Sequence, residues 1–387
     1  MMNSWKWKRT LSMNFIPYGK QFIQDDDITS VVDTLKSDYL TTGPKVKEFE
    51  DALAKFSDVK YCVAVSNGTA ALHLASLVLL NKDDKVLTTP NSFLATSNSI
   101  LYVGAKPLFV DIAKDGNIDL DLCEDELKKD PSIKAIYAVA FSGNMINQDK
   151  LKYLRETYNI AILEDNAHAI GAIYNGVKSG SCANSDISIF SFHPVKHLTT
   201  GEGGAITTNS KELYEKLLTL RSHGMVKTPD MKPWEYEMRD LGFNYRITDI
   251  QCALGLSQLN KLPDFIKRRF EIAKQYDRAF LNSIVKPLYT FDEKSSYHLY
   301  VVQVDFSKLN ISKVDLFNQL REKKIGIQLH YIPINKQPYY KSLGYGSEIM
   351  PNMDRYYEEC FSLPMYPLLS DEEQEYVVNT LFEILNG

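Results

Sequence analysis

The residues of this sequence whose types and order could do chemistry are a lysine, an aspartate and a turn that contains glycine. Asp165 ends the apolar run IAILED (160–165), and Lys196 comes 31 positions later, just after the run SDISIFSF (185–192). A lysine beside a buried strand can lose its proton and form a Schiff base with a carbonyl group. Taken singly, an aspartate at a strand end is more often a helix cap, and a lysine is more often solvated.

The turn Ser66-Asn67-Gly68-Thr69 connects an expected strand, YCVAVS (61–66), to an expected helix. A helix N-terminus presents free N–H groups and the positive end of the helix dipole, which together suit a phosphate. An ordinary N-cap made by Ser, Asn or Thr explains the turn equally well. The sequence contains neither G-x-G-x-x-G nor G-x-x-x-x-G-K-[ST], so the two best-known nucleotide phosphate loops are not indicated.

Together, these three features match the needs of pyridoxal phosphate (PLP). Its phosphate suits the helix N-terminus, its pyridine nitrogen needs a carboxylate that keeps it protonated, and its aldehyde needs a lysine. The 31 positions between Asp165 and Lys196 leave room for one helix and one strand, so both side chains can return to the same edge of a sheet. The sequence therefore predicts a PLP site that combines Gly68, Asp165 and Lys196.

Short β-rich runs alternate with helical patterns through the first half of the chain, which predicts an α/β fold with a mostly parallel sheet covered by helices. The expected strands are 61–66, 85–90, 105–112, 133–141, 160–165, 185–192 and 203–208. The pattern then changes to long helices, one over 250–259 and a second that begins near Pro263, because proline suits a first helical turn. A further strand at 299–306 and the helices after it predict a small α+β domain.

These patterns divide the 387 residues into three expected parts. We expect residues 1–12 to be a disordered tail, because they are basic and aromatic and no apolar signal core follows them. Residues 13–250 would form a large PLP-binding domain, and residues 251–387 a smaller C-terminal domain.

Composition argues against several other classes of protein. The net charge of −5 disfavours a broad nucleic-acid footprint or binding to an anionic membrane surface. The five cysteines are an odd number without a C-x-x-C pair, and no histidine cluster has metal spacing, so we expect no metal and a cytoplasmic location. The longest apolar run, Ala70 to Leu80, is about half the length that a membrane helix needs.

Motifs from about Phe15 to the C-terminus resemble those of the DegT/DnrJ/EryC1/StrS family of sugar aminotransferases, which are fold-type-I PLP enzymes. The matching segments are TTGPKVKEFE (41–50), SNGTAALHLA (66–75), EDNAHAIG (164–171), SFHPVK (191–196), GEGGAI (201–206), GFNYRITDIQ (242–251) and HYIP (330–333). SFHPVK followed by TTGEGG is similar to the branch that aminates C4 of a UDP-linked 4-keto-6-deoxy-N-acetylhexosamine (HexNAc) in pseudaminic acid biosynthesis.

The resemblance implies a role for each cofactor-binding residue. Lys196 would form the internal aldimine and move the proton, and Asp165 would pair with the pyridine nitrogen. Phe93 would stack on the cofactor ring, and His168 would approach its phenolic oxygen. The residues implied in binding the phosphate are Gly68, Thr69, Ser191 and, from the partner subunit, Asn244, which is also a plausible turn former.

The segments that line the sugar nucleotide site in relatives carry, in this chain, Tyr18, Tyr39, Thr41, Gln328, His330 and Tyr331. Asn335 departs from the family pattern, in which a second histidine often follows the HYxP motif. The resemblance also implies that L-glutamate donates the amino group and that the enzyme is a homodimer with shared active sites.

Other functions stay open beside this hypothesis. A relative could act on another nucleotide base, on another sugar stereoisomer or at C3, and a non-catalytic regulator could keep the same fold. A sugar dehydrase of the family would carry histidine in place of Lys196. A short-chain dehydrogenase would need the Tyr-x-x-x-Lys pattern that Tyr174 and Lys178 form here, but Gly176 between them indicates a loop.

Overall fold

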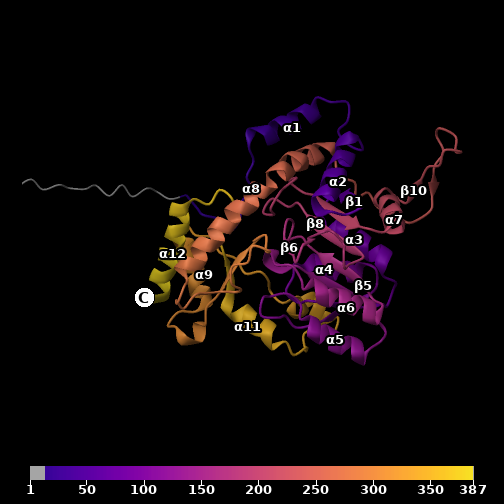
Figure 1. Ribbon diagram of the computed structural model, residues 1–387. Helices are drawn as coiled ribbons and strands as arrows, with labels where there is room; N and C mark the ends of the chain where they lie inside the picture. The colour runs from indigo at the N-terminus through magenta and orange to yellow at the C-terminus, as the bar shows by residue number, and fades with distance from the viewer. Residues whose placement is uncertain (1–13, 387) are drawn as a thin grey trace, which may run out of the picture.

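The computed structural model describes residues 14–386, and the expected tail at 1–12 lies outside the described residues. A seven-stranded sheet with the strand order β1-β9-β8-β5-β4-β2-β3 forms the centre of the molecule (Figure 1). Its strands are β1 (Tyr61–Val65), β2 (Lys85–Thr88), β3 (Lys106–Phe109), β4 (Ile133–Val139), β5 (Ala161–Asp165), β8 (Ile187–Ser191) and β9 (Gly204–Thr208). Each of the seven expected strands is present, and the predicted α/β class is confirmed.

The direction of the strands decides where their ends meet. The pairs β2–β3, β2–β4, β4–β5 and β5–β8 are parallel, whereas β9 is antiparallel to both of its neighbours, β1 and β8. Since β9 separates β1 from β8, these two strands run in the same direction as the other four. The carboxyl ends of six strands therefore lie at one edge of the sheet, which is the edge where α/β proteins bind ligands.

Helices cover both faces of the sheet because its strands are apolar on both sides. On β1, Val63 and Val65 pack in one cluster with α3 and α7, while Cys62 and Ala64 face the other way, toward α2 and α8. The helices before residue 222 are α1 (Asp25–Leu35), α2 (Pro44–Ser57), α3 (Gly68–Leu79), α4 (Leu94–Tyr102), α5 (Leu120–Lys129), α6 (Gln148–Tyr158) and α7 (Lys211–Arg221). A short 3-10 helix, η1 (Phe141–Gly143), follows β4.

A single long helix, α8 (Asp249–Ala279), runs from the large sheet to the C-terminal part of the chain (Figure 1). The prediction that a new helix begins at Pro263 is wrong, because Pro263 lies inside α8. An interior proline costs about 3 kcal/mol, but Leu262 and Phe265 beside it are buried, so tertiary packing keeps the helix continuous. The same helix contributes to a core cluster on the large sheet and to one in the C-terminal part, so the division at residues 250 and 251 stays a prediction.

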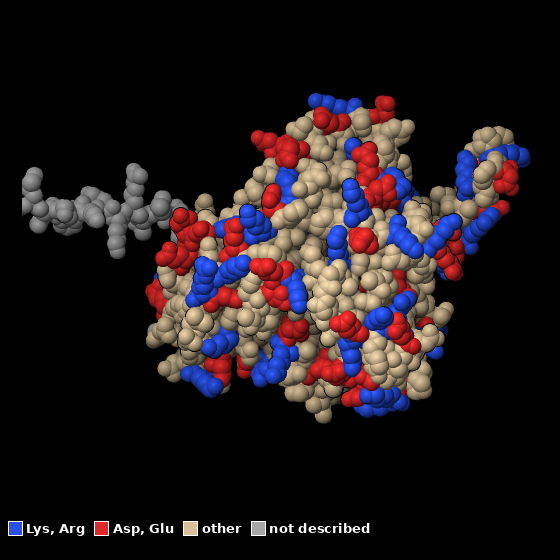
Figure 2. All heavy atoms as spheres, in the orientation of Figure 1, with Lys and Arg blue, Asp and Glu red and all other residues tan. Residues whose placement is uncertain are grey.

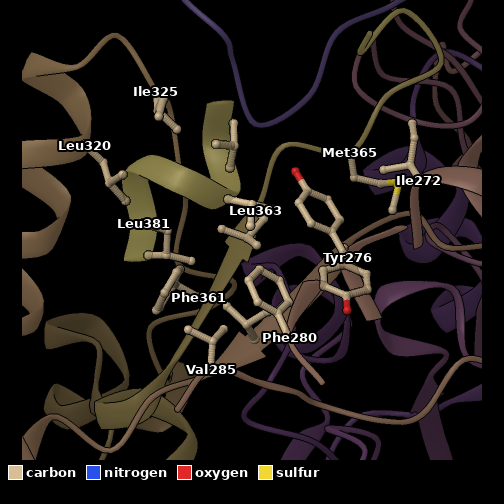
Figure 3. Close-up of a cluster of buried hydrophobic side chains, with 14 of the residues drawn as sticks. Ile272, Tyr276, Phe280, Val285, Leu320, Ile325, Phe361, Leu363, Met365 and Leu381 are labelled. Atoms are coloured by element: carbon tan, nitrogen blue, oxygen red, sulfur yellow. The ribbon is translucent and has the colours of Figure 1, made fainter. Parts of the chain in front are cut away.

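The C-terminal part is built on a three-stranded antiparallel sheet of β12 (Lys286–Pro287), β13 (Tyr300–Gln303) and β14 (Cys360–Leu363). Tyr276 from α8 and Phe280, which directly follows that helix, pack with Phe361 and Leu363 from β14 in its core (Figure 3). Ile16, far away in the sequence, is buried in the same cluster. The remaining helices are η2 (Phe306–Lys308), α9 (Lys313–Glu322), η3 (Ile334–Lys336), α10 (Pro338–Ser342), α11 (Pro351–Glu359) and α12 (Asp371–Asn386).

Two β-hairpins lie outside these two sheets. The first, β6 (Ile173–Tyr174) with β7 (Val177–Lys178), contains the Tyr174 and Lys178 pair and turns through Asn175 and Gly176, both at positive φ. The second pairs β10 (Met225–Val226) with β11 (Glu237–Met238) and stands away from the body of the molecule (Figure 1).

The surface carries acidic and basic side chains intermixed over the face shown in Figure 2. All five cysteines fall within the described residues, where they are buried and free. Within residues 14–386, the structure contains no helix with the length and apolar character that a membrane crossing requires.

Candidate active site

A cavity of about 1150 Å³ opens at the carboxyl edge of the large sheet. Residues that follow β1, β2, β5 and β8 line one side of it, and residues 328–331 of the C-terminal part line another. The predicted cofactor residues Gly68, Thr69, Phe93, Asp165, His168, Ser191 and Lys196 all line this cavity. The chain therefore brings together, in one space, side chains that are more than 100 positions apart.

Asp165 ends strand β5 and is 5% exposed. Its Oδ2 accepts a hydrogen bond of 2.7 Å from the Thr96 hydroxyl, and its Oδ1 accepts one of 3.1 Å from the Ala167 N–H. Burial raises the pKa of Asp165, whereas both hydrogen bonds and the positive charge of Lys196 oppose this rise. The carboxylate is thus oriented by two donors and faces a cation across the cavity.

Lys196 lies in the loop that follows β8, and its N–H bonds to the His193 carbonyl at 2.9 Å. Burial lowers the pKa of Lys196 to about 8, although the charge of Asp165 acts in the opposite direction. A lysine with this pKa is partly neutral near pH 7, which a proton-accepting or nucleophilic amine requires.

The turn before α3 forms a cradle for an anion. Asn67 caps the helix by accepting the Ala70 N–H at 2.8 Å, which leaves the first N–H groups of the helix without an intrahelical partner. A Cβ at Gly68 would lie 3.0 Å from the Cβ and 3.2 Å from the hydroxyl oxygen of Ser191, so glycine allows this close approach. The start of α3 and the Ser191 hydroxyl therefore lie close together at the cavity.

Phe93, His168 and Tyr331 surround the space between this cradle and the C-terminal part. Phe93 precedes α4 and is 60% exposed, so its ring is available to stack on a ligand. His168 Nε2 lies 3.1 Å from the Tyr331 hydroxyl, and burial together with the charge of Lys196 holds the pKa of His168 well below its usual value. The His168 imidazole is accordingly neutral at pH 7.

The predicted substrate residues divide into two groups. Tyr18, Gln328, His330 and Tyr331 line the cavity, and burial lowers the pKa of His330 to about 3. The structure does not bring the predicted substrate residues Tyr39 and Thr41, or the predicted phosphate ligand Asn244, into the cavity of their own chain. Thr41 pairs with Thr248 and Asn244 pairs with Ser222 in isolated bridges.

Asn335 is not among the residues that line the cavity. It is 1% exposed, and its amide donates a hydrogen bond of 3.0 Å to Glu348. In this chain the position therefore supports a local contact rather than the cavity wall.

Several residues that line the cavity were not predicted from the sequence, and Thr96 and His298 are two of them. Thr96 lies in the TTPNSFLATSNS segment, where its spacing of three from Phe93 could have placed it on the same helical turn. His298 lines the cavity from the segment SSYHLY, which offers no recognisable motif. Among the described residues, no group of histidines, cysteines and acids could hold a metal ion.

The donors and acceptors of the cavity fit PLP. The cradle at Gly68 and Ser191 suits its phosphate, Asp165 suits a protonated pyridine nitrogen, and Lys196 suits its aldehyde. Phe93 supplies a ring to stack on, and Ala167 lies in the same cavity beside Asp165.

The chain is similar to proteins of one known family along nearly its whole length. The model of the DegT/DnrJ/EryC1/StrS aminotransferase family matches residues 21–382, which is nearly the whole chain. A curated relative from Campylobacter jejuni subsp. jejuni (strain 81-176), a UDP-4-amino-4,6-dideoxy-N-acetyl-beta-L-altrosamine transaminase, is 42% identical over 373 residues. That alignment covers 96% of this chain and 97% of the relative.

Solved structures agree with the sequence comparison. Helicobacter pylori PseC, described as an aminotransferase involved in the biosynthesis of pseudoaminic acid, matches with a TM-score of 0.91 and 32% identity over 96% of this chain and 100% of that one. The PLP-form of the putative sugar aminotransferase Spr1654 from Streptococcus pneumoniae matches with a TM-score of 0.88 and 32% identity, covering 96% of this chain and 99% of that one. A PMP-form of the same protein matches with a TM-score of 0.89.

Proposed function

The chain belongs to the DegT/DnrJ/EryC1/StrS aminotransferase family, and from this premise we propose that it moves an amino group from L-glutamate to C4 of a UDP-linked 4-keto-6-deoxy-HexNAc. The observation that carries the proposal is the shared cavity of Lys196 and Asp165 beside the phosphate cradle at Gly68. The Campylobacter relative supports the sugar, because its name specifies a transaminase of a UDP-linked 4-amino-4,6-dideoxy sugar.

PLP is the proposed cofactor, since both PLP- and PMP-forms of the Streptococcus neighbour are known. When bound, PLP supplies an electron sink that stabilises negative charge on the carbon that loses a proton. Lys196 would hold the cofactor covalently and, once released and neutral, carry a proton between cofactor and sugar carbon; its lowered pKa supports this role.

The other cavity residues would fix the cofactor in place. Asp165, oriented by Thr96 and Ala167, would hold the pyridine nitrogen in its protonated state. Ser191 and the first N–H groups of α3 would bind the phosphate. Phe93 would stack on the ring, and His168, whose Nε2 lies 3.1 Å from the Tyr331 hydroxyl, would approach the phenolic oxygen.

A homodimer with shared active sites completes this proposal. Among the described residues that line the cavity, Lys196 is the only lysine or arginine, although the proposed substrates carry several negative charges. The exposed positions of Asn244 and Tyr39, outside their own cavity, suit contacts with the cavity of a partner subunit. Asn244 would there join the phosphate site, and Tyr39 and Thr41 the sugar nucleotide site.

The test is a product analysis with two matched substrates. The PLP-loaded protein would be incubated with L-glutamate and either a UDP-linked 4-keto-6-deoxy-HexNAc or a 3-keto nucleotide sugar. Mass spectrometry should detect 2-oxoglutarate and amino sugar in equal amounts from the 4-ketone. Product from the 3-ketone alone would contradict amination at C4, and absence of 2-oxoglutarate would contradict glutamate as the donor.

A further inference from the structure

Strand β14, whose sequence is CFSL, carries one hydroxyl group among apolar neighbours. Ser362 is completely buried, and the residues on both sides of it, Phe361 and Leu363, belong to the core cluster of the C-terminal part. Because side chains alternate across a strand, the Ser362 hydroxyl points to the opposite face from these two. That face also carries Cys360, which packs in a cluster with Phe141 of η1. The Ser362 hydroxyl therefore faces the large sheet.

Ser362 contacts two residues of the cavity wall, one through its backbone and one through its side chain. Its N–H donates to the Gln328 carbonyl at 2.7 Å, and the Gln328 N–H donates to the Ser362 carbonyl at 3.2 Å. Its hydroxyl oxygen lies 2.9 Å from Nδ1 of His330. Gln328 and His330 both line the cavity, so one serine holds two of the predicted substrate residues.

The hydrogen bond between Ser362 and His330 has only one direction that leaves no buried donor unpaired. Among the residues that the structure describes, the Ser362 hydroxyl has no other hydrogen-bond partner. If His330 donated from Nδ1, the serine proton would have no acceptor in a site without water contact, which is costly. The Ser362 hydroxyl therefore donates to Nδ1 of His330.

This direction determines which nitrogen of His330 carries the proton. Burial and the positive charge of Lys196 lower the pKa of His330 to about 3, so the ring is neutral at pH 7. A neutral imidazole has one N–H donor and one acceptor nitrogen. Since Nδ1 is the acceptor, the proton is on Nε2.

The Nε2 atom of His330 is open to the cavity. Within residues 14–386 it has no hydrogen-bond partner, yet it is not one of the unpaired polar atoms that are enclosed in the protein. The Tyr18 ring meets the His330 ring edge-on, with centroids 5.3 Å apart, and the Tyr356 hydroxyl donates to the His330 carbonyl. Ring and backbone are thus both held while Nε2–H faces the space that a ligand would fill.

A neutral N–H donor is suited to an uncharged oxygen. Hydrogen bonds between two charged groups are stronger than those of a neutral donor, so a carboxylate is better served by a cation. Of the two proposed substrates, glutamate carries carboxylates, whereas the sugar offers carbonyl and hydroxyl oxygens. The donor of His330 therefore fits the sugar.

We propose that Ser362 is a positioning residue that keeps the proton of His330 on Nε2, and that His330 donates this N–H to a carbonyl or hydroxyl oxygen of the sugar. The assignment of the oxygen rests on the proposed function, whereas the assignment of the tautomer does not. The Ser362 side chain acts only through His330, because it lies behind the ring and does not line the cavity.

The tautomer can be read directly by ¹⁵N NMR of the histidine-labelled full chain, loaded with PLP and without substrate. The sequence contains seven histidines, and the signal of His330 is the one that is absent from the His330→Gln variant. We expect a proton on Nε2 and none on Nδ1 at pH 7. A proton on Nδ1, alone or together with one on Nε2, would overturn the proposal.

Ser362→Ala removes the hydroxyl and leaves the backbone bonds to Gln328 in place. The His330 signal should then change to a mixture of both tautomers. KM for the keto sugar should rise about 2- to 10-fold, as for the loss of one neutral hydrogen bond, while the reaction with glutamate keeps its rate. Ser362→Thr retains the hydroxyl and should retain both properties. An unchanged KM for the keto sugar in Ser362→Ala would contradict the role of this serine.

A double variant tests whether Ser362 acts through His330. His330→Phe should raise KM for the keto sugar at least as much as Ser362→Ala does, and His330→Gln should raise it less, because the glutamine amide can place an N–H near the position of Nε2. Ser362→Ala combined with His330→Phe should have the KM of His330→Phe alone. Additive effects of the two substitutions would overturn the positioning role.

Controls keep the outcomes distinct. Ser185→Ala removes another buried serine hydroxyl, which donates to Glu164 at 2.7 Å outside the cavity, and should change neither the His330 tautomer nor KM. If the extra methyl group of Ser362→Thr prevents folding, the wild-type spectrum and Ser362→Ala still decide. The predicted tautomer in a protein that does not respond to glutamate would overturn the proposed function but not the assignment of the His330 proton.

Discussion

The hydroxyl group of Thr96 donates a hydrogen bond of 2.7 Å to Oδ2 of Asp165, deep in the wall of the cavity. Since the Thr96 proton points to the carboxylate, its oxygen accepts the proton of Ser92, whose hydroxyl lies 2.8 Å away. The Ala167 N–H occupies Oδ1. These donors stabilise the ionised form of Asp165 against its burial, which is the form that a protonated pyridine nitrogen needs.

Replacing Thr96 with valine should therefore weaken the enzyme and change its pH dependence. The hydrogen bond lowers the pKa of Asp165, so its loss raises that pKa and moves the acidic limb of activity to higher pH. A hydrogen bond to a charged group contributes about 1.5–3 kcal/mol, which corresponds to roughly 10- to 100-fold in kcat. Thr96→Ser keeps the hydroxyl and should retain both properties; an acidic limb unchanged in Thr96→Val would refute the role of this bond.

Lys196→Ala should abolish the visible absorbance of the lysine-bound cofactor. Loss of the general base alone should reduce turnover by roughly 10²- to 10⁴-fold. The matched control is Lys178→Ala, which removes an exposed lysine of the Tyr-x-x-x-Lys pattern in the β6–β7 hairpin and should leave spectrum and turnover unchanged. Activity lost in Lys178→Ala but kept in Lys196→Ala would instead favour short-chain dehydrogenase chemistry.

In the cofactor-free protein, burial of the charged Lys196 side chain should lower the free energy of unfolding. Burial lowers its pKa to about 8, below the value in the unfolded chain, so the unfolded chain binds more protons between about pH 8 and 10.5. The contribution of Lys196 to stability is therefore unfavourable below pH 8 and recovers as the pH rises through this window.

Lys196→Met should accordingly be more stable than the wild type at pH 7, by on the order of 3 kcal/mol. The difference should shrink toward zero near pH 10. Urea denaturation of both proteins across this pH range is the measurement, and a difference that does not depend on pH would speak against a lowered pKa.

Asp165→Asn should keep some cofactor but lose most activity, because the amide cannot hold a proton on the pyridine nitrogen. We expect at least about a 100-fold drop in kcat, as for other groups that stabilise charge at a reaction centre. Glu164→Gln offers a neighbouring control, since Glu164 points to the opposite face of β5, where Gln148 and Ser185 each donate to it at 2.7 Å. That variant should melt at a lower temperature with unchanged kcat; near-normal turnover in Asp165→Asn would contradict the proposed role.

Mixed dimers test whether Asn244 acts in the partner's site. A hybrid of one Lys196→Ala subunit and one Asn244→Ala subunit would contain one site with both defects and one site with neither. Random mixing of the two inactive proteins should then restore roughly a quarter of wild-type activity. If Asn244 acted within its own chain, each site would keep one defect and no activity would return.

Local sequence patterns were sufficient to predict the strands of the large sheet and the reactive residues at its carboxyl edge. Apolar runs predicted the seven strands, and parallel strands necessarily bring their carboxyl ends together, which placed Asp165 and Lys196 in one cavity. Gly68 was recognisable as part of the turn between a strand and a helix, and the structure adds the reason for glycine there, because the Ser191 side chain comes close.

Contacts between distant segments were not predictable in this way. Pro263 favours a helix start by its own preference, but burial on both sides of it decides the outcome in α8. His298 reaches the cavity from a segment whose backbone, at Ser296 and Leu299, bonds to the carbonyls of Gly143 and Ser142, and no local sequence pattern predicts these contacts. Thr41 belongs to a matching motif and Tyr39 lies just before it, yet the cavity of their own chain contains neither residue, because a motif does not specify which subunit a residue would serve.

Absorbance spectroscopy of the two half-reactions tests the central claim most directly. The purified protein with PLP would be measured before and after L-glutamate, and again after a UDP-linked 4-keto-6-deoxy-HexNAc. We predict that the visible band disappears with glutamate and returns with the keto sugar, because the amino group passes first to the cofactor and then to C4. A band that does not respond to glutamate would contradict an aminotransferase that uses this donor, and a band that fails to return would contradict the proposed sugar.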